Sequence, residues 1–214
     1  MAASATLPVP ASAGVRFRFP TASGRLWRTA SQLPRPTRKA TAALAHLDAM
    51  RVRRREPTDR PAVEDFLARW NSLRVARLGR IERALDHPGL IADDNGRLVG
   101  VLTYVLDGPR CEVLTLHVDD RRRGVGSALV AEAKEVAATA KCTRLWVITT
   151  NDNLDALRFY QRRGFRLAAL HTGAVDHSRT RLKPEIPLLG AHGIPLRDEL
   201  ELEQEISSCE GTDR

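Results

Sequence analysis

The segment RRRGVGSAL, residues 121–129, stands between an apolar run and a long alanine-rich segment. The run before it, CEVLTLHV at residues 111–118, is typical of a strand that is buried on both faces. The segment after it consists of good helix formers as far as Ala140. Where a strand turns through glycines into a helix, backbone N–H groups point outward at the helix N-terminus and favour an anion. We therefore predict a pyrophosphate cradle, in which Gly124 and Gly126 let the ligand approach the backbone.

Two other phosphate-binding patterns fit this segment poorly. A P-loop requires Gly-Lys-Ser/Thr, whereas Gly126 is followed directly by Ser127. A dinucleotide fingerprint requires Gly or Ala where this chain has Leu129, and an acid at the end of the next strand, where this chain has Thr149 and Thr150. The sequence thus excludes the P-loop class and makes a Rossmann site a weak interpretation.

A second pattern, NxxAxxFYxxxGF, runs from Asn153 to Phe165. Together with the pattern RxxGxG, from Arg121 to Gly126, it resembles the GNAT superfamily of N-acyltransferases over roughly residues 52–167. In that family an Arg or Gln lies three residues before Gly-x-Gly/Ala after the fourth strand. A later helix ends with a Tyr near the coenzyme sulfur, and Gly-Phe leads into the sixth strand.

The resemblance implies an α/β fold of the GNAT type, with a mixed, mostly antiparallel, twisted sheet of about seven strands flanked by helices. It also implies an N-acetyltransferase with acetyl-CoA as cosubstrate, an amine as acceptor and no metal. In the family the fourth and fifth strands splay apart and the pantetheine arm of the coenzyme lies in the gap. The residues that the resemblance assigns to coenzyme binding are Leu116, His117, Val118, Arg121, Arg122, Arg123, Gly124, Val125, Gly126, Ser127, Asn153 and Tyr160.

The resemblance assigns catalytic roles to Tyr160 and Glu112. Tyr160 would give a proton to the departing thiolate, although a core aromatic paired with Phe159 is the alternative interpretation. Glu112 would act through water as the base that takes a proton from the amine, although a Glu at the start of a strand is often simply solvated. His117, which can titrate near neutrality, is another candidate base, and the N–H of Val118 would polarise the thioester carbonyl.

The remaining pattern predicts the other elements. Strands are expected at residues 51–55, 90–93, 98–106, 111–118, 145–149 and 165–171, with a turn at Asn95-Gly96. Helices are expected from Pro61, over 73–85, from Gly126 to Ala140, and over 153–163. Residues 176–195 read as a long Pro-rich and Gly-rich connection, followed by an edge strand near 195–203.

That connection is a candidate lining for the acceptor pocket, since long loops are often functional. His177 and Arg179 would suit an acidic acceptor group, and the acids of the last strand would suit a cationic amine. These acids are Asp198, Glu199, Glu201 and Glu203. The identity of the acceptor stays open.

Charge and composition argue against several other classes. The net charge of +8 is concentrated in residues 1–49, which hold six Arg and one Lys against a single acid, Asp48. Residues 50–214 hold 27 bases and 25 acids, a weak footprint for nucleic acid. Three scattered cysteines, Cys111, Cys142 and Cys209, fit neither a zinc site nor a disulfide framework.

The chain is predicted to have one domain with two tails. Residues 1–49 are expected to be a disordered basic extension, residues 50–206 the acetyltransferase domain and residues 207–214 a flexible tail. An organelle transit peptide is one alternative for the extension; a start codon at Met50 is another and is favoured over it. With no run of 18 apolar residues, we expect a soluble, cytoplasmic protein that binds neither membrane nor nucleic acid, and a homodimer is left open. A catalytically idle CoA-binding or regulatory module of the same fold is the alternative function.

Overall fold

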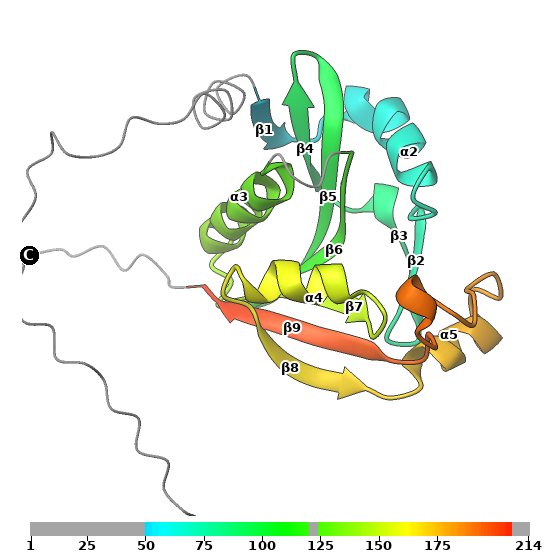
Figure 1. The fold of residues 1–214 in the computed structure, drawn as a ribbon. Helices are drawn as coiled ribbons and strands as arrows, with labels where there is room; N and C mark the ends of the chain where they lie inside the picture. Colours follow the sequence, from blue (N-terminus) through cyan, green and yellow to red (C-terminus); the bar gives the residue numbers. More distant parts are fainter. Residues whose placement is uncertain (1–49, 120–123, 207–214) are drawn as a thin grey trace, which may run out of the picture. The chain divides into compact units, whose positions relative to one another are not determined.

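The computed structural model describes residues 50–119 and 124–206, and Figure 1 shows its elements. Seven strands form one sheet, in which β6 and β7 are the only parallel neighbours among the described strands. In sheet order the strands are β1 (Met50–Arg54), β4 (Gly89–Asp94), β5 (Arg97–Asp107), β6 (Arg110–Val118), β7 (Arg144–Thr150), β9 (Glu199–Glu205) and β8 (Arg166–His171). The predicted mixed, mostly antiparallel sheet is confirmed.

Helices cover both faces of this sheet. The helices are α2 (Arg60–Ala68), α3 (Val125–Thr139), α4 (Leu154–Gln161) and α5 (Ala174–Arg181), with short 3-10 turns η2 (Pro57–Asp59), η3 (Ala84–Asp86) and η4 (Ala191–Gly193). The main core lies under α3 and α4 and contains Leu129, Tyr160 and Leu202. A smaller core lies between α2 and the opposite face of β4 and β5, where Phe66 meets Val101. Figure 1 shows α2 and α3 on opposite sides of these strands.

The first part of the chain follows the predicted pattern. Pro61 lies in the first turn of α2, where the missing N–H costs nothing. The Asp59 carboxylate bonds Arg53 at 2.6 and 2.7 Å and accepts the Glu56 N–H at 2.7 Å, which fixes the entry to the helix. The turn from β4 to β5 has positive φ at both Asn95 and Gly96, as the Asn-Gly pair predicted.

The helix predicted over residues 73–85 is wrong. In its place β2 (Arg74–Arg77) and β3 (Arg80–Arg83) form a separate antiparallel hairpin. The turn between these strands has φ of 45° at Leu78 and 72° at Gly79. Two successive left-handed residues cannot continue a right-handed helix, and the glycine makes this turn accessible.

Two predictions in the C-terminal part also need correction. The last strand is not at an edge: β9 lies between β7 and β8, and β8 is the edge strand. The acids of β9 are tolerated inside the sheet because arginines of β6 and β7 pair with them, Arg110 with Glu201 and Arg144 with Glu203, each at 2.9 Å. The long connection also contains a helix, α5, which its polar sequence concealed.

None of the described helices is both long and apolar enough to cross a membrane.

Candidate functional site

A gap opens in the middle of the sheet between β6 and β7. The two strands pair only through Arg110–Val113 and Arg144–Val147, although β6 continues to Val118 and β7 to Thr150. The register between β5 and β6 shifts at this point, because Tyr104 pairs with Val113 and Thr103 with Thr115. Leu114 is therefore a bulge residue, which bends β6 away from β7. The predicted separation of these two strands is confirmed.

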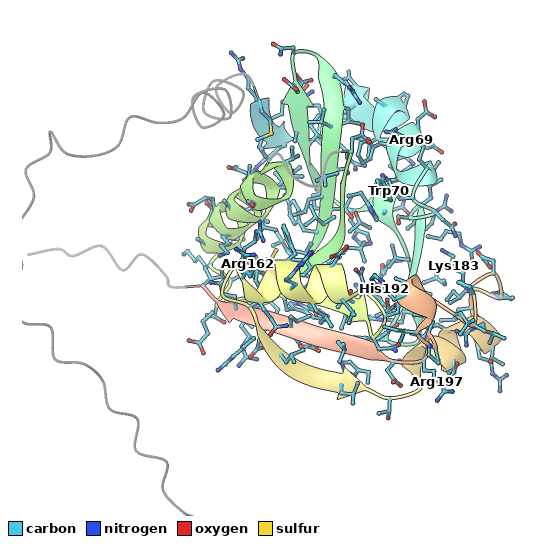
Figure 2. All side chains as sticks on the ribbon, viewed as in Figure 1. Arg69, Trp70, Arg162, Lys183, His192 and Arg197 are labelled. Carbon is cyan, nitrogen blue, oxygen red and sulfur yellow. The ribbon has the colours of Figure 1, made fainter. Side chains whose placement is uncertain are left out.

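The residues of β6 beyond the bulge keep their ladder with β5 only. Their edge toward β7 thus presents backbone N–H and C=O groups that none of the other described strands pairs with. Leu116 and Val118 pack against the main core, so the His117 side chain points to the opposite face. There it stacks on Trp70, which is labelled in Figure 2, with ring centroids 5.2 Å apart and an interplanar angle of 15°.

The glycine turn meets the N-terminus of α3 beside this gap. Gly124 is the N-cap residue in a left-handed conformation, with φ of 80°, and no side chain in the described part of the chain caps the helix. Val125 and Gly126 form the first turn and are buried. A Cβ at Gly126 would lie 3.2 Å from the Phe159 ring, so this glycine also lets α4 pack against α3. The predicted phosphate residues Arg121, Arg122 and Arg123 lie outside the described residues.

Arg163 adds a positive charge to this helix terminus. Its guanidinium donates to the Oγ of Ser127 and, at 2.7 Å, to the carbonyl of Phe159. It also lies 3.5 Å above the centroid of the Phe159 ring. Burial lowers the pKa of Arg163, and the nearby Arg162 adds to that effect. Arg163 was not among the residues predicted from sequence, although its position directly before Gly164-Phe165 was a signal that pointed to it.

Asn153 and Tyr160 lie on α4, which follows β7. Asn153 is the N-cap, and its Oδ1 accepts the Ala156 N–H at 3.1 Å. The Tyr160 ring is 5% exposed and meets Phe159 and Phe165 edge-on, with centroids 5.1 and 5.2 Å away. Burial raises the pKa of Tyr160, so its phenol keeps its proton at neutral pH. The ring is a core aromatic, as the alternative interpretation had it, and the acid role of its hydroxyl stays a prediction.

Glu112 is buried rather than solvated. Its side chain is 4% exposed, and Oε2 lies 2.6 Å from Nη2 of Arg77, which is equally buried on β2. Burial raises the pKa of Glu112 to about 7, against the opposing pull of Arg77 and with a further rise from Glu82. A carboxyl group that titrates near neutrality suits a general base.

The side chains proposed from sequence for the acceptor are largely engaged elsewhere. Arg179 donates to the carbonyls of Ile186, Pro187 and Leu196 at 2.6–2.9 Å, which holds the connection in place. Glu199 is 2% exposed and accepts the Leu78 N–H at 2.8 Å. Asp198 accepts the Gly173 N–H, while Glu201 and Glu203 pair with arginines. His177 also lies by the hairpin, and its ring is 3.9 Å from where a Cβ of Gly79 would be.

Within residues 50–119 and 124–206, no three His, Cys, Asp or Glu side chains are grouped as a metal site would require.

Comparison with known proteins points to one family. Residues 50–165 match the model of the Acetyltransferase (GNAT) family. The Bacillus subtilis protein YdhI is 41% identical over 138 residues, which cover 64% of this chain and 86% of YdhI. Another Bacillus subtilis protein, YxbD, is 43% identical over 122 residues, which cover 57% of this chain and 76% of YxbD.

Solved structures share the fold. A Bacillus subtilis acetyltransferase in complex with CoA has a TM-score of 0.55 at 20% identity, over 74% of this chain and 99% of that one. The ribosomal-protein-S18-alanine N-acetyltransferase of Escherichia coli has a TM-score of 0.54 at 16% identity, over 76% of this chain and 97% of that one.

Proposed function

The chain belongs to the GNAT acetyltransferase family, and from this premise we propose that it transfers an acetyl group from acetyl-CoA to an amine. The amine would belong to a small molecule or a peptide and would attack directly in a ternary complex. One observation carries the proposal: β6 and β7 part at Val113, beside a helix whose N-terminus is capped by a left-handed glycine, Gly124. This arrangement offers unpaired strand amides for an extended arm and a helix N-terminus for a pyrophosphate.

The coenzyme would lie along the edge of β6. Main-chain groups of Leu116 and Val118, on either side of His117, would bond the pantetheine arm. The pyrophosphate would bind at Arg121, Arg122, Arg123, Gly124, Val125, Gly126 and Ser127, and Asn153 would fix the segment that closes beside it. The solved Bacillus subtilis relative that contains CoA supports a coenzyme site in this fold.

The chemistry would need two proton transfers. The amine nitrogen attacks the thioester carbonyl carbon, and the backbone N–H of Val118 stabilises the oxyanion that forms. Glu112 takes the proton from the nitrogen, through a water molecule. The C–S bond then breaks, and Tyr160 gives its phenolic proton to the departing thiolate.

An acceptor screen with two readouts tests this function. Calorimetry measures the binding of acetyl-CoA, and a thiol-release assay over a panel of small amines and peptide N-termini measures transfer. We expect binding, and thiol release with at least one class of amine. Binding without thiol release on any amine would favour the second candidate, an idle CoA-binding module. The absence of binding would refute the coenzyme site itself.

A further inference from the structure

The turn between β2 and β3 contacts two buried acids on different strands of the main sheet. Nη2 of Arg77 lies 2.6 Å from Oε2 of Glu112 on β6. The N–H of the next residue, Leu78, donates to Oε2 of Glu199 on β9 at 2.8 Å. Because β6 and β9 are the two neighbours of β7, this turn spans β7 from one side to the other.

The register places this turn over the open part of the gap. Glu112 is level with Trp146 on β7, and Glu199 is level with Thr150. The pairing of β6 with β7 ends one residue beyond Glu112, at Val113. Val113 faces the main core, so Glu112 points to the opposite face, where the hairpin lies. The hairpin turn therefore covers the gap on the face of the sheet opposite α3 and α4.

The contact between Arg77 and Glu112 is unusual for a purely structural pair. Both residues are 3% exposed, yet Nε and Nη1 of Arg77 and Oε1 of Glu112 have no hydrogen-bond partner among the described residues. A buried ion pair that leaves such atoms unbonded contributes little to stability. The geometry instead orients the Glu112 carboxylate, because one short bond holds Oε2 while Oε1 has no hydrogen-bond partner among the described residues.

We propose that Arg77 is a positioning residue for acetyl transfer, an inference that rests on the function proposed above. It holds the Glu112 carboxylate by Oε2 so that Oε1 receives the proton of the acceptor amine. The turn that carries Arg77 forms the acceptor side of the gap. Lys183, labelled in Figure 2, follows α5 and connects it to the start of the hairpin, because it donates to the carbonyls of Asn71 and Arg74 at 3.1 and 3.0 Å.

Charged side chains from the hairpin and from β6 act on Glu112, and Arg77 has the largest effect of them on its pKa. The hairpin contributes Arg77, Arg80 and Glu82, and β6 itself contributes Arg110. After burial, Arg77 has the largest effect on the pKa of Glu112, and it lowers that pKa. Its removal would raise the pKa further, so that Glu112 would be protonated, and unable to accept a proton, up to a higher pH.

The pH dependence of kcat/KM tests this role in wild type, Arg77→Met and Arg77→Lys. In Arg77→Met we expect the acidic limb to move upward by about one pH unit or more, with roughly a tenfold loss at neutral pH that alkaline buffer restores. Arg77→Lys keeps the charge and should lie between the two, with the KM for acetyl-CoA unchanged in both variants. Arg83→Met is the matched control, since Arg83 is on the same hairpin with a side chain 74% exposed.

A titration of the Glu112 carboxyl by carbon NMR, assigned with Glu112→Gln, gives a readout that needs no acceptor. An upward shift in Arg77→Met supports the coupling, and an unchanged titration overturns it. If wild type is active but the acidic limb does not move in Arg77→Met, the role of Arg77 is refuted while acetyl transfer stands. If wild type transfers no acetyl group to any amine, the proposed function falls and the role of Arg77 falls with it. The Lys variant keeps the test decisive should Arg77→Met fold poorly.

Discussion

Arg163, just beyond the end of α4, donates a hydrogen bond from Nη2 to the Oγ of Ser127 in the first turn of α3. This bond connects the two helices that flank the proposed coenzyme and places a guanidinium where a pyrophosphate would bind. Arg163 is half-buried and held on three sides, by Ser127, by the Phe159 carbonyl and by the Phe159 ring. Its charge is therefore oriented before any ligand arrives, which lowers the cost of binding an anion.

Arg163→Met should weaken CoA binding by about tenfold, because it removes this oriented charge from the helix N-terminus. Calorimetry at two salt concentrations checks the prediction, and the salt dependence of the affinity should decrease in the variant. Arg162→Met is the matched control, since Arg162 is adjacent, exposed and labelled in Figure 2. Equal losses in both variants would contradict a specific role for Arg163.

Gly124→Glu should abolish measurable CoA binding. The substitution puts a carboxylate at the N-cap of α3, where the pyrophosphate is proposed to lie, and strains a residue with φ of 80°. Gly108→Glu is a useful control, because Gly108 also has positive φ, 53°, and a Cβ there meets nothing within 4 Å. It lies in the turn before β6, at the far end of that strand from Gly124. A normal affinity in Gly124→Glu would refute the cradle.

The sequence predicted best where local chemistry decides the backbone. Asn95-Gly96 gave the turn from β4 to β5, and Asn153 gave the start of α4, because each depends on residues within a few positions. The strand, glycine turn and helix around Gly124 were predicted for the same reason. Glu112 lies on the strand before this turn, next to the gap between β6 and β7, so local sequence was enough to name it as a candidate.

Long-range pairing accounts for what the sequence did not predict. Residues 73–85 are rich in Arg, Leu and Ala, which favour a helix. They form a hairpin whose turn bonds Glu199, 121 positions away. Likewise, the position of β9 inside the sheet depends on arginines of three other strands, of which Arg166 on β8 is one. Neither contact leaves a periodicity in the segment itself, so Arg77 could not be recognised as the partner of Glu112.

The stability of the protein should depend on pH through Glu112. The folded-state pKa of this group is raised, to about 7, above its usual value of 4.5. A raised pKa means that the folded state holds the proton more tightly than the unfolded state. The protonated Glu112 therefore adds to the free energy of unfolding below about pH 4.5, and this stabilisation is lost as pH rises through 7.

Glu112→Gln removes the titrating group at this position. As pH rises from about 4 to about 8, the free energy of unfolding of wild type should therefore fall by about 3 kcal/mol relative to that of Glu112→Gln. Urea unfolding at both pH values measures this difference. Glu135→Gln, at an exposed position of α3, is the matched control and should follow wild type. A pH-independent difference between wild type and Glu112→Gln would contradict the raised pKa.

Tyr160→Phe separates the two roles of this residue. The ring packs between Phe159 and Phe165 and would be retained, so the free energy of unfolding and the affinity for CoA should change little. The hydroxyl would be lost, and with it the proton for the departing thiolate, so turnover should fall by about a hundredfold.

Phe159→Leu provides the comparison, because it disturbs the same aromatic contacts without removing a proton donor. It should lower stability more than Tyr160→Phe and turnover less. Steady-state rates measured by thiol release, beside urea unfolding of both variants, give the result. If Tyr160→Phe kept wild-type turnover, the hydroxyl would have no part in the chemistry, and the buried ring would be the whole role of Tyr160.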